Sequence, residues 1–317
     1  MRLNVLGVLS AVLVVGCGPL EAGVVVVDDG RDGQSSALEV ASVDQPDTVD
    51  AVSWNVEWYG DPLHGPSDEA TQQANVRRVA SHLAPDLLGL VEVVSEDAFK
   101  AVVQAMPAHD GLLVTDPRVV GGAANYSADE QKVALIFNKR FTVESAQVVV
   151  TQASYAFAGR PPMEVHLRFT ENGKPRTLVV LVAHFKAMAN ADGYRRRTAA
   201  SAALKTYLDA TYAARWVLTM GDLNDDVDTS TYRHSESPFA NFVADANYRF
   251  VTKALTDANQ STTVGFSSTI DHHLVTKALA ARYVEGSVQV LHPDLVVQSY
   301  GTTTSDHYPV LSRYDLR

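Results

Sequence analysis

Segments that read as fully buried β-strands recur along the chain from residue 48 onward. "PDLLGLVEV", "TLVVLVAHF" and "RWVLTMGDLND" are apolar on both faces, so a sheet built from them needs cover above and below. Helix chemistry lies between them: residues 67–83 have a Ser cap, early acids and apolar residues at helical spacing, and residues 192–214 are rich in Ala. The pattern predicts sheets buried between helical layers, an α/β (α+β) class, and one domain over residues 48–317.

The N-terminal residues read as a targeting segment. Residues 1–16 combine a short positive start with an apolar run that is too short to span a membrane and fits a secretory signal. The following "VVGCGP" resembles a bacterial lipobox, which implies cleavage before Cys17 and lipid attachment to its thiol. The alternative is an ordinary signal peptide with an incidental cysteine. Residues 17–47 are expected to be a tether, because they are rich in Gly, Asp and Ser and have no sustained period.

This segment predicts an extracytoplasmic lipoprotein, anchored in the outer membrane or held in the periplasm, or alternatively a secreted protein. The membrane contact is then the N-terminal lipid, and the domain is expected to be a monomer. Cys17 is the only cysteine in the chain, so no internal disulfide can form. The net charge of −11 gives no general attraction to nucleic acid, although it leaves room for a local basic patch or a phosphate-binding metal.

Polar residues gather where the predicted strands end. They are Asn55, Glu57, Glu92, His184, Asp222, Asn224, Asp271, Asp306 and His307. Carboxylate and amide oxygens without a cysteine cluster favour Mg²⁺, with Mn²⁺ or Ca²⁺ as alternatives, over structural zinc. Histidines add proton transfer near neutral pH, and the combination suits phosphoester hydrolysis. A single strand-end Asp is more often a turn or cap residue, so it is the ordered set that points to a site.

The ordered set resembles the endonuclease/exonuclease/phosphatase superfamily, which includes deoxyribonuclease I and neutral sphingomyelinases. The matching pieces are "SWNVEW", "LLGLVEV", "KVALIFN", "VAHFKA", "GDLND", "TIDHHLV" and "TSDHYPV", in the family's order over residues 48–313. The resemblance implies a four-layer sandwich of two packed mixed β-sheets flanked by helices. Two positions depart from the family's usual residues: Val91 replaces a Gln and His272 replaces a Tyr.

The resemblance also implies roles for individual residues. Glu92, Asn55 and Asp306 would bind the metal, and His307 would be the catalytic histidine, oriented by Asp271. Asp222 and Asn224 would position water and phosphate. His184 and, more weakly, Tyr126 would contact the phosphate.

Substrate remains open at this level. The basic stretch "YRRRTAA" places Arg195, Arg196 and Arg197 near the start of a helix, where they could contact a nucleic-acid backbone or simply be solvated. A nuclease is the first hypothesis, and a phospholipid (sphingomyelinase-like) or sugar-phosphate phosphoesterase is the second. A non-catalytic binding protein is the third.

The stretch "STIDHHLV" looks at first like a metal-binding histidine pair. Strand alternation places Asp271 and His273 on one face and His272 on the other, so the adjacent histidines cannot chelate one ion from a regular strand. We expect His272 to be structural, and His273 to lie in the core or beneath the site.

Overall fold

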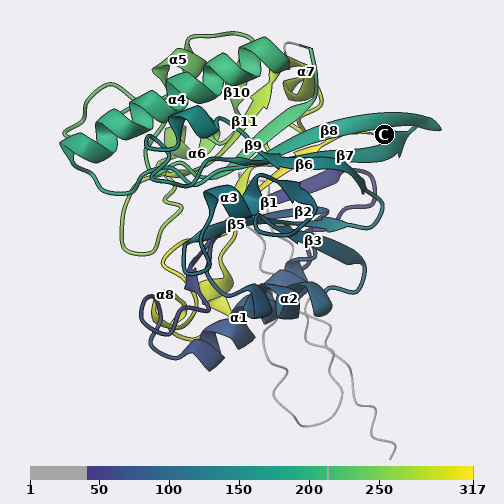
Figure 1. Cartoon of the computed structure of the whole chain (residues 1–317), viewed down its shortest axis with the longest axis vertical. Coiled ribbons are helices and arrows are strands. Elements are labelled where there is room, and N and C mark those ends of the chain that lie inside the picture. The colour runs from purple at the N-terminus through teal and green to yellow at the C-terminus, as the bar shows by residue number, and fades with distance from the viewer. Residues whose placement is uncertain (1–40, 213, 317) are drawn as a thin grey trace, which may run out of the picture.

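Four layers make up the described part of the protein, which is residues 41–212 and 214–316 of a computed structural model (Figure 1). Helices α1 (Glu69–Leu83) and α2 (Glu96–Gln104) cover one sheet, a second sheet packs on the first, and α4 (Ala191–Thr211) covers the second sheet. The predicted sandwich of two mixed sheets flanked by helices is confirmed. The predicted signal peptide, Cys17 and residues 18–40 of the tether lie outside the described residues.

The first sheet has six strands in the order β12-β13-β1-β2-β5-β3. Their bounds are β1 Val49–Tyr59, β2 Leu87–Val93, β3 His109–Leu113, β5 Lys132–Asn138, β12 Gln289–Val290 and β13 Val310–Tyr314. The central pair, β1 and β2, is parallel, and the other pairs are antiparallel. The chain therefore ends β1 and β2 at the same edge.

The second sheet has seven strands in the order β10-β11-β9-β8-β7-β6-β4. Their bounds are β4 Val119–Val120, β6 Thr142–Val148, β7 Met163–Glu171, β8 Lys174–Val182, β9 Val217–Asp222, β10 Tyr248–Phe250 and β11 Asp271–Thr276. Strands β8 and β9 are parallel, and β11 runs antiparallel to β9 with Asp271 opposite Asp222. These three strands carry functional side chains at one end of the sheet.

Short helices and turns complete the described chain. They are α3 Gly122–Asn125, α5 Ala240–Val243, α6 Lys253–Asp257, α7 Lys277–Ala280, α8 Tyr300–Thr303, and the 3₁₀ turns Thr151–Ala153 and Pro293–Leu295. None of the helices among the described residues is long and apolar enough to cross a bilayer.

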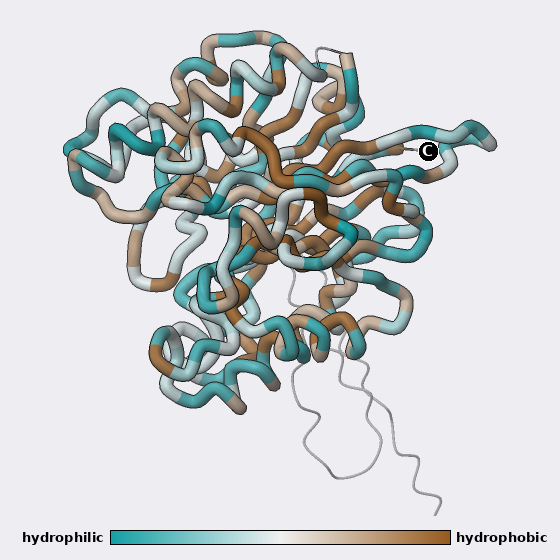
Figure 2. Tube along the Cα trace, in the orientation of Figure 1, coloured by the Kyte–Doolittle hydropathy of each residue, from teal (hydrophilic) through white to brown (hydrophobic). Residues whose placement is uncertain are grey.

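Side-chain alternation divides the core into layers. Along β1, Val52 and Trp54 pack under α1 and α2, whereas Ala51 faces the second sheet. Hydrophobic residues accordingly follow the central strands, and hydrophilic residues follow the outer sides of the helices (Figure 2). Each sheet is apolar on both faces because each has a neighbour on both, as the sequence predicted.

Local signals fix several element ends. Ser95 caps α2 by accepting a hydrogen bond from the backbone N of Ala98 at 3.1 Å. The cap of α1 is Asp68, whose carboxylate accepts from the N of Thr71 at 3.0 Å, and not Ser67. Asp serves this position as well as Ser does, so the two neighbouring candidates could not be separated by residue type.

A histidine ties the two sheets together. His273 on β11 bonds Ser312 on β13 through Nδ1 at 2.6 Å and Ser53 on β1 through Nε2 at 3.0 Å. His272 faces the other way, with Nδ1 2.9 Å from the Thr252 hydroxyl. The two adjacent imidazole rings therefore lie on opposite faces, as alternation predicted, and they bond different side chains.

Candidate active site

Functional side chains from both sheets meet at one end of the sandwich. Asn55 and Glu92 lie near the carboxyl ends of the parallel strands β1 and β2, and Asp222 ends β9. His184 follows β8, while Asp271 begins the antiparallel β11 and so reaches the same end. The topology thus brings together residues that are up to 252 positions apart, Asn55 and His307.

Glu92 points into the site because the backbone breaks its strand pattern. Its φ is +65°, and the pairing of β2 with both neighbouring strands shifts register around it. One carboxylate oxygen accepts from the Asn55 amide at 3.0 Å. The other accepts from the Trp58 backbone N at 3.2 Å and from the Gln131 amide at 2.5 Å. Three donors therefore hold this carboxylate in one orientation.

Asn55 links the two carboxylates nearest the centre of the site. Its amide nitrogen donates to Glu92 and, also at 3.0 Å, to Asp222. Its amide oxygen accepts from the Glu57 backbone N at 2.9 Å. Asn55 therefore fixes the spacing of the Glu92 and Asp222 carboxylates.

His307 and Asp271 form a buried hydrogen-bonded pair. Nδ1 of His307 lies 2.8 Å from the Asp271 carboxylate, which leaves Nε2 facing Asp222 at 3.8 Å. The His307 carbonyl accepts from Trp54 Nε1 at 3.2 Å and from the Tyr300 hydroxyl at 2.6 Å. Both the ring and the backbone of His307 are thus held in place, and Nε2 is the ring nitrogen left to react.

The two histidines of the site have opposite electrostatic character. Burial lowers the pKa of His307, but the carboxylates of Asp271 and Asp222 outweigh that effect and hold the pKa well above its usual range. Burial lowers the pKa of His184 well below its usual range, and the nearby Arg160 guanidinium lowers it further. His307 is therefore suited to hold and release a proton, whereas His184 is a neutral imidazole.

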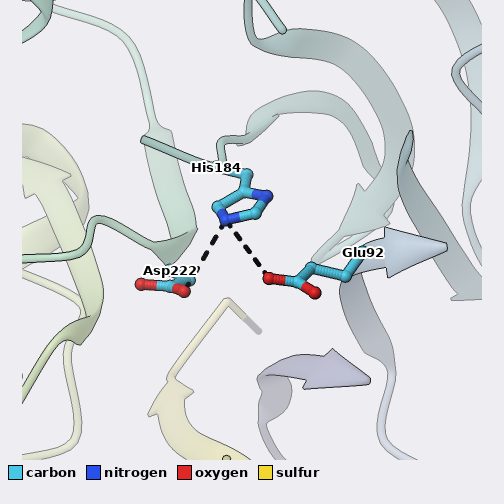
Figure 3. Close-up of side chains that lie close together, drawn as sticks. All are labelled: Glu92, His184 and Asp222. Carbon is cyan, nitrogen blue, oxygen red and sulfur yellow. Dashed lines mark ion pairs between the residues drawn. The ribbon is translucent and has the colours of Figure 1, made fainter. Parts of the chain in front are cut away.

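Glu92, His184 and Asp222 form the group most suited to an ion (Figure 3). Nε2 of His184 lies 3.6 Å from Glu92 and 3.8 Å from Asp222, and neither ring nitrogen has a hydrogen-bond partner among the described residues. Burial raises the pKa values of Glu92 and of Asp222, the latter to about 7. A divalent cation fits this donor set, because it would satisfy the imidazole and offset the crowded carboxylates.

Two predicted site residues lie at the margin of that group. Asn224 has φ +58°, and its amide donates to the Phe185 carbonyl at 3.2 Å, while its backbone N donates to Asp222 at 2.8 Å. Asp306 is about half exposed, with one carboxylate oxygen 3.9 Å from His307 Nε2. Asp306 is not within the groups that could chelate an ion among residues 41–212 and 214–316. Its predicted role as a ligand remains a prediction.

The hydroxyl of Tyr126 is bonded away from the carboxylates. Tyr126 is buried, and its hydroxyl donates to the Pro161 carbonyl at 2.7 Å. A contact with phosphate would require that bond to be given up.

The basic helix start divides into three different environments. Arg195 is 74% exposed, and Arg196 donates through Nε and Nη2 to the Tyr155 carbonyl while stacking on the Tyr155 ring at 4.2 Å. Arg197 is fully buried and pairs with Asp225 at 2.9 Å. Arg197 is therefore a structural anchor and cannot contact a nucleic-acid backbone, because no part of it reaches solvent.

Sequence reasoning missed Arg160 and Gln131. Arg160 is 8% exposed, its Nη1 donates to Gln131 Oε1, and its buried Nε has no hydrogen-bond partner among the described residues. Gln131 in turn donates to Glu92. An Arg-Pro-Pro sequence directly before a strand was the available signal, since it places Arg160 at a strand start, but nothing in it reveals burial.

Comparisons with known proteins agree with this geometry. The model of the Endonuclease/Exonuclease/phosphatase family matches residues 52–307. Similar solved structures include a humanized zebrafish (D. rerio) TDP2, with 13% identity, a TM-score of 0.59, and coverage of 84% of this chain and 99% of that one. The human Nocturnin catalytic domain with bound sulfate has 16% identity and a TM-score of 0.58, with 87% and 97% covered.

A bacterial structure belongs to the same set. An endonuclease/exonuclease/phosphatase from Bacteroides vulgatus has 14% identity and a TM-score of 0.56, and 85% of this chain and 99% of that one are covered. No curated protein sequence matches the chain significantly. At these identities the structural likeness shows a shared fold.

Proposed function

Because the chain belongs to the endonuclease/exonuclease/phosphatase family, we propose that it is a divalent-metal-dependent phosphodiester hydrolase, and most specifically a nuclease. Members of this family are typically metal-dependent hydrolases of phosphoesters. The observation that carries the proposal is the buried His307–Asp271 pair, whose free Nε2 faces Asp222 beside the Glu92–His184–Asp222 group. A proton-transfer group and a cation site thus lie next to each other.

The side chains present can divide the work of phosphodiester hydrolysis. When bound by Glu92, His184 and Asp222, a divalent cation would supply charge neutralisation on a phosphate oxygen. His307 takes a proton from the attacking water at Nε2. The Asp271 carboxylate holds the other ring proton of His307 on Nδ1 and compensates the positive charge that develops on the ring. Arg160, with an unpartnered Nε, can donate to a phosphate oxygen.

A local basic group supports nucleic acid as the substrate. Lys186 lies two residues after His184, and its pKa is lowered by burial and by the neighbouring Arg196 and Arg160, which shows that these cations crowd one another. Such a group attracts phosphates even though the chain is acidic overall. One structural relative, zebrafish (D. rerio) TDP2, was solved with a single-strand DNA product. It is 16% identical to this chain with a TM-score of 0.55, and the match covers 84% of this chain and 98% of that one.

A phospholipid phosphoesterase is the second candidate. Leu63, Met188 and Phe266 are 84%, 63% and 74% exposed, and they lie on loops that follow β1, follow β8 and precede β11. Apolar side chains on loops next to a site can enter a lipid surface. This candidate would also place the substrate in a membrane to which a lipid on Cys17 could bring the enzyme.

The first experiment compares the full chain with two histidine variants. Plasmid DNA, single-stranded DNA, RNA, sphingomyelin vesicles and a phosphomonoester are incubated with Mg²⁺, Mn²⁺, Ca²⁺ or EDTA. We expect metal-dependent cleavage of nucleic acid, reduced at least a hundredfold in His307→Ala. His82→Ala is the matched control, because His82 lies in the last turn of α1, at the opposite end of the sandwich.

The outcomes separate the candidates. Hydrolysis of sphingomyelin alone would favour the lipid enzyme, and no metal-dependent hydrolysis of any substrate would favour a non-catalytic binding protein. Near wild-type turnover in His307→Ala, with an unchanged circular dichroism spectrum, would refute the catalytic assignment.

We also propose that the enzyme acts outside the cytoplasm, as a monomeric lipoprotein anchored through Cys17. The lipobox-like "VVGCGP" supports this location. Metabolic labelling with a radioactive fatty acid tests it: label should enter the wild type and be lost in Cys17→Ser, and an unlabelled wild type would contradict the anchor. Size-exclusion chromatography of the detergent-free domain should give a monomer.

A further inference from the structure

A polar cavity lies at the end of the second sheet opposite the candidate active site. It has a volume of about 440 Å³, and its lining includes Glu144, Arg168, Arg176, Thr177, Arg215 and Trp216. Arg176 and Thr177 belong to the start of β8, and Trp216 directly precedes β9. His184 and Asp222 lie at the other ends of these two strands, six or more residues away, so the cavity is roughly 20 Å from the candidate active site.

The cavity is positively charged within an acidic protein. Three arginines line it against one glutamate, although the chain as a whole carries −11. Glu144 is 3.7 Å from Arg168 and accepts a hydrogen bond from Thr177 at 2.7 Å. No carboxylate pairs with Arg215 in the described part of the chain. Glu144 and the buried Glu171, which pairs with Arg176 at 2.6 Å, are together fewer than the three arginines, so the lining keeps an excess of positive charge.

The orientation of Arg176 is fixed before any ligand arrives. Buried Glu171 accepts from Arg176 Nε at 2.6 Å and, through its other oxygen, from Arg282 at 2.9 Å. Both guanidinium groups lie over the indole of Trp216, with carbon-to-ring distances of 5.8 and 5.3 Å. Because Nε is taken by Glu171, the terminal nitrogens of Arg176 are left for other acceptors.

We propose that this cavity binds the phosphate group of a small phosphorylated molecule or of an anionic lipid headgroup. Guanidinium forks match the tetrahedral oxygens of phosphate, and the pre-oriented Arg176 loses little entropy on binding it. The volume lies within the range of small-molecule sites. The proposal does not depend on the catalytic function, since the two sites share no residue.

The test reads the indole N–H of Trp216 by ¹H–¹⁵N NMR. The chain has three tryptophans, and the other two, Trp54 and Trp58, lie on β1 near the candidate active site. Trp216→Phe identifies the resonance. EDTA-treated, dialysed protein is titrated with sn-glycerol 3-phosphate, with glycerol as the neutral control. In a separate arm, co-sedimentation measures binding to phosphatidylglycerol vesicles against phosphatidylcholine vesicles.

We expect a saturable shift of the Trp216 resonance with glycerol 3-phosphate, and affinity at least about tenfold weaker in Arg215→Ala, because a charge-assisted hydrogen bond is lost. Lys100→Ala, which removes one exposed positive charge on α2, should bind as the wild type does. Binding that depends on Arg215 only with phosphatidylglycerol vesicles would identify the headgroup as the ligand. The proposal is overturned if neither probe binds, or if Lys100→Ala weakens binding as much as Arg215→Ala.

Discussion

Replacing Asp271 by Asn isolates the electrostatic part of the His307–Asp271 pair. The substitution keeps the shape of a fully buried side chain whose Oδ2 lies 2.8 Å from His307 Nδ1. A hydrogen bond to a charged group contributes about 1.5–3 kcal/mol, and one pKa unit corresponds to about 1.4 kcal/mol. The pKa of His307 should therefore fall by about one to two units, and should stay partly raised because Asp222 remains 3.8 Å from Nε2.

Two measurements test this expectation. An NMR titration of the His307 ring in metal-free protein measures its pKa directly. In the pH–rate profile, the limb that rises as His307 loses its proton should move to lower pH by about one to two units, because a group with a lower pKa deprotonates earlier. The rate on the plateau should fall by about tenfold to hundredfold, which is the same 1.5–3 kcal/mol expressed as a barrier.

Asp97→Asn on α2 is the matched control, since the Asp97 side chain is 97% exposed and lies 3.9 Å from Lys100 rather than against His307. A plateau rate that falls in Asp271→Asn without any change in the pKa of His307 would show that Asp271 only packs against the ring. An unchanged rate together with an unchanged pKa would refute the pair as a functional unit.

Three further predictions concern the cation site, the Arg197–Asp225 ion pair and Arg160. The Tm in Mg²⁺ should exceed the Tm in EDTA by more at pH 8 than at pH 5. Burial raises the pKa values of Glu92 and Asp222, so protons compete with the cation at low pH. An equal increase in Tm at both pH values would contradict cation binding by these carboxylates. Arg197→Ala should lower the free energy of unfolding in urea by about 3–5 kcal/mol, because Asp225 is left buried and unpaired, whereas exposed Arg195→Ala should leave it nearly unchanged. Arg160→Gln should lower kcat/KM for a phosphodiester at least about tenfold. The control is Arg118→Gln, which changes an arginine paired with Asp110 and Asp116 and should leave kcat/KM unchanged. Equal kcat/KM values for Arg160→Gln and the wild type would show that Arg160 does not act in the site.

The sequence predicted the layers and the meeting point of the polar residues. Both follow from local rules: strands apolar on both faces need two neighbours, and residues at strand ends gather at one edge of a sheet. The alternation of Asp271, His272 and His273 is equally local, because β11 is regular.

Features that depend on backbone irregularity or on distant packing could not be predicted. Glu92 faces the site because its own backbone is left-handed near the end of the apolar strand β2, where no glycine or asparagine signals it. Arg197 is one of three consecutive arginines, and only the positions of Asp225 and of the Lys186 and Met188 carbonyls select it for burial. Arg160 and Gln131 join the site across separate loops, so no spacing in the sequence relates them to Glu92.

The hydrogen bonds of His273 limit how far the two sheets can be displaced from each other. The first sheet supplies Asn55, Glu92 and His307, and the second supplies His184, Asp222 and Asp271. A slip of one residue along a strand is about 3.3 Å, as large as the separations within the site, and apolar surfaces alone resist such sliding weakly.

Ser53 and Ser312 both reach His273 at only one offset of the sheets. Substitutions in this tie can therefore reduce turnover without changing a reacting group. A screen for folded but inactive variants should recover positions in the middle of the sandwich as well as those at its end.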